Sequence, residues 1–256
     1  MSELRIAVLV KQVPDPALVE ISEDGRLMRE NVPAMIDPFG KMALQHAVAL
    51  KCQRHIDAVS MGPMQAQDVL RKSLEFGADG AYLISGREFA GADTIATART
   101  MSAFLSKRDY DMVFCGMQAT DGDTAQVPSE LAVFLKANIY SYVSSIDIEN
   151  MTVTQNYENS TVVSKIALPA VITFMRPPEG CVQIPSMTDY VSASDKEIEV
   201  LGIDDLGISV YATGSHGSRT KVSAVATVMR KRKDTVFVDG SDTVSAAETI
   251  LKEARR

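Results

Sequence analysis

The sequence of 256 residues has no tryptophan, only three cysteines and three histidines, and 6% aromatic residues. Its cysteines, Cys52, Cys115 and Cys181, are far apart and form neither a CxxC motif nor a Cys/His cluster, which argues against a zinc or iron–sulfur site. Unpaired thiols are typical of a reducing compartment, so a cytoplasmic location is expected. Cys115 ends an apolar run and is expected to be buried as a small hydrophobe.

An excess of positive charge is also missing: 26 Lys and Arg stand against 33 Asp and Glu, for a net charge of -7. A nucleic-acid or membrane-surface partner would require a basic face, so neither is expected. No apolar run reaches the roughly 18 residues that a membrane span needs. The first residues, MSELRIAVLVKQ, lack the pattern of a signal peptide and predict a first strand. A hydrophobic fraction of 46% indicates a folded chain with a real core.

Three common functional motifs are absent as well. The sequence has no Walker lysine loop, no GxGxxG fingerprint and no GxSxG elbow, which argues against a P-loop NTPase, an ordinary dinucleotide-binding domain and an α/β-hydrolase. The histidines, His46, His55 and His216, are scattered and are expected at the surface or at helix caps. No nucleophile–base pair is evident, so a hydrolytic enzyme has little support.

What the sequence does contain is an alternation of strand and helix patterns. Strand-like runs are Arg5–Val10, Ile56–Met61, Ala81–Ile84 and Met112–Cys115. Helical spacing follows the Asp37-Pro38 cap and recurs over Ala66–Phe76, Asp93–Leu105 and Pro128–Leu135. This alternation predicts an α/β fold with a mostly parallel twisted sheet flanked by helices.

The pattern changes after residue 137. Four strand-like runs predict an antiparallel addition to the sheet: Tyr140–Ile148, Met151–Tyr157, Thr161–Ala167 and Ala170–Phe174. Residues 21–31, with Asp24-Gly25, predict a small hairpin or excursion. Residues 1–203 are expected to form the α/β nucleotide-binding domain. Residues 204–256, with a basic cluster at 230–233 and a last helix near Val244–Ala254, lack a core of their own and are expected to form a C-terminal arm.

Polar loops follow several of the predicted strands, at the edge where parallel sheets bind ligands. The segment Gly116–Pro128 is polar, holds two glycines and leads into a helix, so its backbone N–H groups favour phosphate. Thr124 and Gln126 add side-chain donors, whereas Asp121 and Asp123 would repel phosphate. These carboxylates either accept from a ribose or nucleobase or hold the loop in shape. A long capped connection without a ligand remains an alternative.

Several segments occur in the order of a known family. They are LVKQVPD (9–15), IDPFGKMAL (36–44), VSMGP (59–63), FGADGAYLIS (76–85), GMQATDGDTAQV (116–127), LPAVITF (168–174) and the close from Ile198 to Gly207. On these residues the chain resembles the β subunit of electron transfer flavoproteins. The resemblance implies an adenine nucleotide α-hydrolase-like fold and a heterodimer with a larger α subunit. The C-terminal arm, residues 204–256, would pack on that subunit. It implies an electron carrier rather than an enzyme.

Such proteins take electrons from dehydrogenases, acyl-CoA dehydrogenases of fatty acid oxidation among them, and pass them to a quinone oxidoreductase or another acceptor. One FAD is held mostly by the α subunit, and the β subunit holds AMP or, in members that use NADH for electron bifurcation, a second FAD. No catalytic or metal-binding residue is implied. A nucleotide-binding (AMP/ATP) regulatory module is the alternative from another functional class.

The loops and the resemblance together predict the site residues. Cofactor binding is expected at Leu9, Lys11, Asp37, Pro38, Phe39, Met61, Gly62, Asp93, Thr94, Gly116, Gln118, Asp121, Gly122, Asp123, Thr124, Ala125, Gln126, Val127 and Pro128. Partner docking is expected at Ile184, Pro185 and Met187.

The sequence departs from the family pattern in informative places. The family usually has asparagine at the position of Asp37, and a carboxylate can cap the helix but cannot donate. The simple carriers tend to have D-D-D-x-N-Q-T-G where this chain reads DGDTAQVP (121–128), a form closer to the bifurcating members, so FAD is favoured over AMP. Gly122 and Ala125 would let the ligand approach the backbone. The docking loop lacks the family's arginine, which predicts a different dehydrogenase partner.

Overall fold

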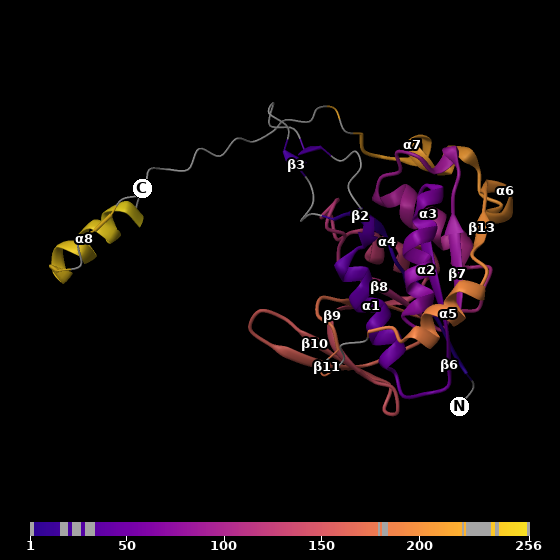
Figure 1. Cartoon of the computed structure of the whole chain (residues 1–256), viewed down its shortest axis with the longest axis horizontal. Helices are drawn as coiled ribbons and strands as arrows, with labels where there is room; N and C mark the ends of the chain where they lie inside the picture. Colours follow the sequence, from indigo (N-terminus) through magenta and orange to yellow (C-terminus); the bar gives the residue numbers. More distant parts are fainter. Residues whose placement is uncertain are drawn as a thin grey trace. The chain divides into compact units, whose positions relative to one another are not determined.

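A nine-stranded sheet organises the first of the two units into which the chain divides, Met1–Ser223 and Ala224–Arg256 (Figure 1). The computed structural model describes residues 3–15, 20–21, 27–28, 34–178, 180, 184–221, 223, 237–238 and 241–254. In sheet order the strands are β11 (Thr161–Lys165), β10 (Thr152–Asn156), β9 (Asn138–Asp147), β12 (Ala170–Phe174), β8 (Met112–Gly116), β1 (Leu4–Leu9), β6 (Arg54–Met61), β7 (Gly80–Ile84) and β13 (Glu199–Leu201).

The first strand is an inner strand because its side chains are apolar on both faces. Ile6, Ala7 and Val8 of β1 are all fully buried, two facing one side of the sheet and one the other. β1 pairs in parallel with both β6 and β8. The predicted α/β fold with a mostly parallel sheet is confirmed.

The antiparallel addition is smaller than predicted. β10 runs antiparallel to both β9 and β11, and these three strands form the salmon-coloured projection at the bottom of Figure 1. The prediction was wrong for Ala170–Phe174, because β12 pairs in parallel with both β8 and β9. All five residues of β12 are buried, as expected for a parallel strand that is covered on both faces.

Helices cover both faces of the sheet. α1 (Pro38–Ala49), α2 (Gln67–Glu75) and α5 (Met187–Asp195) contribute Leu44, Leu70 and Ala193 to the core on one face. α3 (Thr94–Leu105) and α4 (Val127–Leu135) contribute Phe104 and Leu131 on the other. The remaining elements of the unit are α6 (Ile203–Leu206), α7 (Gly214–Gly217), 3₁₀ turns at Met64–Ala66, Arg87–Phe89 and Val210–Ala212, and two ribbons, β2 (Gln12–Pro14) with β5 (Ala34–Ile36) and β3 (Glu20–Ile21) with β4 (Leu27–Met28).

The β3–β4 pair is antiparallel, in agreement with the predicted excursion, but the Asp24-Gly25 turn lies outside the described residues. Among the helices that the structure describes, none is long and apolar enough to cross a membrane.

The boundary between the units differs from the predicted position. Residues 204–223 belong to the first unit, where Leu206 is buried and Ser215 N donates to Ala90 O at 2.9 Å. Gly214 lies so close that a Cβ there would be 2.2 Å from Glu88 O. This segment is attached to the first unit through backbone contacts and helix caps. Its sequence therefore has no long apolar run from which the attachment could be predicted.

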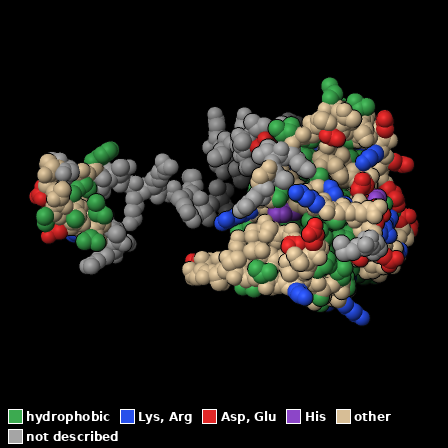
Figure 2. Space-filling view, turned by 90° about the horizontal axis from the view of Figure 1, so that it is seen from below, with side chains coloured by type: hydrophobic (Ala, Val, Ile, Leu, Met, Phe, Trp, Pro, Cys, Tyr) green, Lys and Arg blue, Asp and Glu red, His purple; other side chains and the backbone are tan. Residues whose placement is uncertain are grey.

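The second unit contains α8 (Thr243–Ala254), which confirms the predicted last helix. Val244, Ile250 and Leu251 lie on one side of α8 at helical spacing and are 58–68% exposed. Figure 2 shows green hydrophobic side chains at the surface of this unit. The basic cluster 230–233 lies outside the described residues.

Candidate nucleotide site

The strand order defines where a ligand is expected. The chain leaves β1 toward β6 and β7 on one side, and later places β8 and β12 on the other side. In an open α/β sheet, ligands bind at such a switch point, beyond the carboxyl ends of the strands. The segments that follow β1 and β8 begin at Val10 and Met117, and both contain predicted site residues.

Two glycines bring the backbones of three elements together at this edge. A Cβ on Gly116, the last residue of β8, would lie 2.5 Å from Phe39 Cβ and 2.9 Å from Gly40 N. A Cβ on Gly40 would lie 3.4 Å from Leu9 O. The start of α1 therefore packs directly on the ends of β1 and β8. Pro38 and Phe39, which are predicted to bind the cofactor, lie at the switch point.

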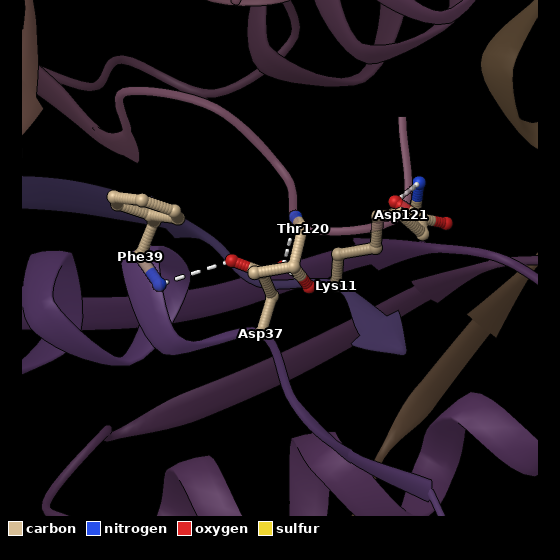
Figure 3. Close-up of polar contacts among 5 residues, drawn as sticks. All are labelled: Lys11, Asp37, Phe39, Thr120 and Asp121. Carbon is tan, nitrogen blue, oxygen red and sulfur yellow. Dashed lines mark hydrogen bonds and ion pairs between the residues drawn. The ribbon is translucent and has the colours of Figure 1, made fainter. Parts of the chain in front are cut away.

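Asp37 caps α1 and also holds the loop after β8. Its Oδ1 accepts from Phe39 N at 3.0 Å, and its Oδ2 accepts from both Thr120 N and Thr120 Oγ1 at 2.7 Å (Figure 3). The residue is only 2% exposed, and the positive end of the helix dipole stabilises its negative charge. Every one of these contacts donates to the side chain, so a carboxylate suits this position better than an amide. Thr120 was not among the predicted site residues.

Lys11, in the segment that follows β1, also contacts the loop after β8. Its Nζ lies 2.8 Å from Asp121 Oδ1, and its backbone O accepts from Asp37 N at 2.8 Å (Figure 3). Opposite charges of the loops after β1 and β8 are thus paired across the switch point. This pairing removes part of the conflict between Asp121 and a phosphate ligand.

The loop beyond Asp121 is exposed and has an unusual backbone. Asp123 and Ala125 have φ values of 51° and 54°, in the left-handed region that non-glycine residues rarely adopt. Gly122 has no such requirement, and a Cβ there would meet no atom within 4 Å. Strained backbone of this kind is often found at binding loops. The open space beside Gly122 is where a ligand could approach the chain closely.

The start of α4 differs from those of α1 and α3. Gln126 occupies the cap position but forms no side-chain cap, whereas Asp37 and Asp93 cap their helices. Thr94 Oγ1 lies 3.2 Å from Gln126 Oε1 and 3.0 Å from Glu130 Oε1, which ties α3 to the first turn of α4. The structure therefore brings together Thr94 and Gln126, two of the predicted cofactor-binding residues, beside a helix start suited to an anion.

Both carboxylate oxygens of Asp93 accept hydrogen bonds from other residues of the chain. Its Oδ1 accepts from Ala96 N at 2.9 Å, which confirms the predicted cap of α3. Its Oδ2 accepts from Arg219 N at 2.6 Å and Thr220 N at 2.9 Å, which anchors the end of the first unit. Partial desolvation alone would raise the pKa of Asp93, but the hydrogen bonds from Ala96, Thr220 and Arg219 together outweigh it and lower the pKa.

We expect Asp93→Asn to weaken the acid dependence of stability. Because the pKa is lowered on folding, the carboxylate contributes stability above the pKa of the unfolded chain, about 3.9, and loses it as the pH falls through the folded value. Urea unfolding at pH 7 and pH 3 measures this loss. Glu158→Gln, at an exposed position outside the helices and strands, is the control and should lose as much stability on acidification as the unchanged protein; equal losses for Asp93→Asn would contradict the assignment.

The other predicted nucleotide contacts lie at the same edge. Leu9 ends β1 and Met61 ends β6, and both are partly buried against the α3–α4 face. Gly62 follows directly and donates its N–H to Ile84 O at 3.1 Å. Gln118 and Thr124 belong to the loop after β8, and Val127 and Pro128 begin α4.

The predicted docking residues form a separate group. Ile184 and Met187 are 81% and 79% exposed, and Pro185 between them is half-buried. Ser186 caps α5 through a reciprocal capping box with Asp189, so the helix start is firmly defined. Residues 181–183, which complete the loop in the sequence, lie outside the described residues.

A polar cluster at the opposite edge was missed in the sequence. Asp57 is 1% exposed, and its carboxylate contacts His55 Nε2 at 3.0 Å and accepts from Tyr110 Oη at 2.7 Å. Desolvation, followed by the hydrogen bond to Asp57, raises the pKa of Tyr110. The only available signal was the i, i+2 spacing of His55 and Asp57 on one strand face.

The predictions for single residues gave mixed results. Cys115 is buried as predicted, and burial raises the pKa of its thiol to about 12. The prediction for His46 was wrong, because the ring is buried and stacks on Phe174 with 4.1 Å between centroids. Desolvation lowers the pKa of His46, opposed by its hydrogen bond to Arg176 O. In the described part of the chain, no group of three or more His, Cys, Asp or Glu could hold a metal ion.

Two cavities lie away from the switch point. One of about 340 Å³ lies between the ends of α3 and α4, lined by Leu105 and Tyr110 among others. The other, about 470 Å³, lies beside the hairpin strands and is lined by Tyr142 and Tyr157. Neither is lined by a predicted nucleotide contact, and strand topology together with loop chemistry favours the switch point as the site.

Comparison with known proteins finds similar chains. Residues 24–184 match the family model described as "Electron transfer flavoprotein domain". The chain is 39% identical to "Electron transfer flavoprotein subunit beta" of Thermoanaerobacterium thermosaccharolyticum, over 91% of this chain and 92% of the relative. It is 38% identical to the subunit of the same name from Clostridium acetobutylicum, over 88% of both chains. It is 37% identical to "Caffeyl-CoA reductase-Etf complex subunit CarD" of Acetobacterium woodii, over 86% of both.

Proposed function

Because the chain belongs to the electron transfer flavoprotein family, among its beta subunits, we propose that it pairs with an α subunit in an FAD-containing heterodimer. In this proposal the heterodimer carries electrons from a dehydrogenase to a quinone reductase or another acceptor in the cytoplasm. The observation that carries the proposal is the similarity to a beta subunit over 91% of the chain. The name of the Acetobacterium relative supports a CoA-thioester enzyme as the partner.

We further propose that the switch point holds a nucleotide, FAD rather than AMP. The residues fit such a group: α4 begins without a side-chain cap, Lys11 offers an ammonium group, and Gly122 leaves space beside the backbone. When bound, FAD supplies the redox chemistry, and the protein binds and orients it. Thr120, Thr124 and Gln126 lie in the same loop and can add hydrogen bonds.

The test is to co-express the chain with its α subunit, extract the nucleotides from the purified heterodimer and count them. Two FAD per heterodimer would support the proposal in full, since the α subunit accounts for one of them. One FAD with one AMP would reject the second FAD but keep the carrier. A chain that folds alone, retains AMP or ATP and never yields flavin would favour a regulatory module instead.

We propose that Ile184, with Pro185 and Met187, selects the dehydrogenase. A single aliphatic side chain that is 81% exposed beside proline makes an efficient anchor for a pocket on a partner. Ile184→Ser is expected to lower the rate of electron transfer from the dehydrogenase at least tenfold while leaving the nucleotide count unchanged. The exposed Val163→Ser on β11 is the control; a similar loss in both variants would remove the special role of Ile184.

We propose that the second unit packs on the α subunit. The support is the apolar stripe of Val244, Ile250 and Leu251 on α8, which exposes side chains that a partner would bury. In this proposal the arm is the unit Ala224–Arg256, a shorter segment than the 204–256 expected from the sequence.

A further inference from the structure

Lys11 and Asp121 belong to a closed ring of contacts that joins three separate segments (Figure 3). Asp37 N donates to Lys11 O, and Thr120 N donates to Asp37 Oδ2. Asp121 follows Thr120 in the chain and completes the ring through its ion pair with Lys11 Nζ. The ring restricts where the ammonium group can lie, because both the backbone of Lys11 and the carboxylate that pairs with it are anchored.

The two side-chain links of this ring differ in burial. Asp37 is 2% exposed and accepts three hydrogen bonds, so breaking its contacts would leave a buried carboxylate without its donors. The side chains of Lys11 and Asp121 are 48% and 33% exposed. An exposed ion pair contributes little and can exchange partners readily. The Asp37–Thr120 contact is therefore the permanent link, and the Lys11–Asp121 pair is the exchangeable one.

Resting on the proposed nucleotide site, we infer that Lys11 recognises the ligand phosphate and that Asp121 competes with the phosphate for the same ammonium group. A phosphate carries more charge and more acceptor oxygens than a carboxylate, so it is the stronger partner for a lysine. Asp121 lies directly before Gly122 in the loop that leads to the uncapped start of α4. In the absence of Lys11, its charge would repel phosphate. Asp121 is thus a negative regulator of affinity rather than a ligand contact.

The inference predicts effects of opposite sign for two residues of one ion pair. The heterodimer, dialysed free of nucleotide, is titrated with ADP and with adenosine. Asp121→Asn should bind ADP about two- to fivefold more tightly, the range expected from losing an exposed competitor. Lys11→Met should bind ADP roughly tenfold more weakly, and Lys11→Arg should recover most of the affinity. Adenosine, which has no phosphate, should bind equally to all variants.

Three controls separate recognition from structure and from net charge. Lys11→Met and Asp121→Asn remove the same ion pair, so their melting temperatures should shift equally. Glu199→Gln removes one negative charge from the Arg108–Glu199 pair, which does not involve the switch-point loops, and should leave ADP affinity unchanged. The double variant Lys11→Met/Asp121→Asn should lose most of the gain, because competition requires the lysine.

The outcomes distinguish the inference from the function on which it rests. Weaker ADP binding by Asp121→Asn would show that the pair is only structural and would overturn the inference. An equal gain with adenosine, or with Glu199→Gln, would do the same. If the unchanged heterodimer bound neither ADP nor FAD at this site, the nucleotide site itself would be rejected, and the inference with it.

Discussion

Asp37→Asn is expected to destabilise the first unit by about 2 kcal/mol and to deplete the bound nucleotide. The carboxylate accepts from Phe39 N on one oxygen and from Thr120 N and Oγ1 on the other. An amide has only one oxygen, so its NH2 group must face one of the two backbone N–H groups. The Thr120 hydroxyl can rotate to accept from that group, but a backbone N–H cannot. Urea unfolding and the nucleotide count of the heterodimer measure the two effects.

Thr120→Val provides the matched control for this prediction. It removes the hydroxyl contact and keeps the backbone N–H, so a smaller cost of about 1 kcal/mol is expected. Equal costs for the two variants, or an Asp37→Asn protein with its full nucleotide content, would contradict the role assigned to the carboxylate. The family resemblance implies asparagine here in other members, whereas in this chain all three donors meet a carboxylate.

Gly116→Ala is expected to cost about 1–3 kcal/mol, toward the upper end of the range for overpacking. The added Cβ would lie 2.5 Å from Phe39 Cβ, 2.7 Å from Phe39 C and 2.9 Å from Gly40 N. Two of these are backbone atoms at the start of α1, which cannot move without shifting the helix and the Asp37 cap with it. Urea unfolding of the purified variant measures the cost.

Gly122→Ala is the counterpart within the same loop. A Cβ at this position meets no atom of the chain within 4 Å, and the residue does not need a left-handed backbone. Its unfolding free energy should therefore stay within about 0.5 kcal/mol of the original, while nucleotide retention falls because the methyl group occupies the space of the ligand. Unchanged retention would mean that the ligand does not approach Gly122, and an unaffected Gly116→Ala would mean that α1 can shift freely.

Local patterns predicted the elements well, and contacts over long sequence distances were the main source of error. The caps at Asp37 and Asp93 depend on neighbouring residues, and both were confirmed. The predicted direction of β12 was wrong because four consecutive strand-like runs are typical of hairpins. That β12 instead lies parallel to β8 depends on the path of the whole chain. The attachment of 204–223 was missed because it depends on backbone contacts to Glu88 and Ala90 rather than on an apolar stripe.

The site was predicted as a region but not as a set of contacts. The segments after β1 and β8 were both singled out from their polar residues. Asp37 and Thr120 are 83 positions apart in the chain, and Lys11 and Asp121 are 110 apart. Such pairs become visible only when the register of β1 against β8 is known. The sequence alone therefore did not explain the negative charge of Asp121 in a predicted phosphate-binding loop, whereas the structure shows its ion pair with Lys11.

The inner position of β1 also has a consequence for synthesis on the ribosome. β1 emerges well before both of its partners, since Leu4 pairs with Arg54 and Ile6 pairs with Met112. Its apolar side chains must wait for both neighbours, since parallel pairing with distant strands is slow to form. During translation the apolar residues Ile6, Ala7 and Val8 of β1 thus lack their sheet neighbours until β8 has left the exit tunnel. Chaperones that shield apolar strands can bind β1 throughout this interval.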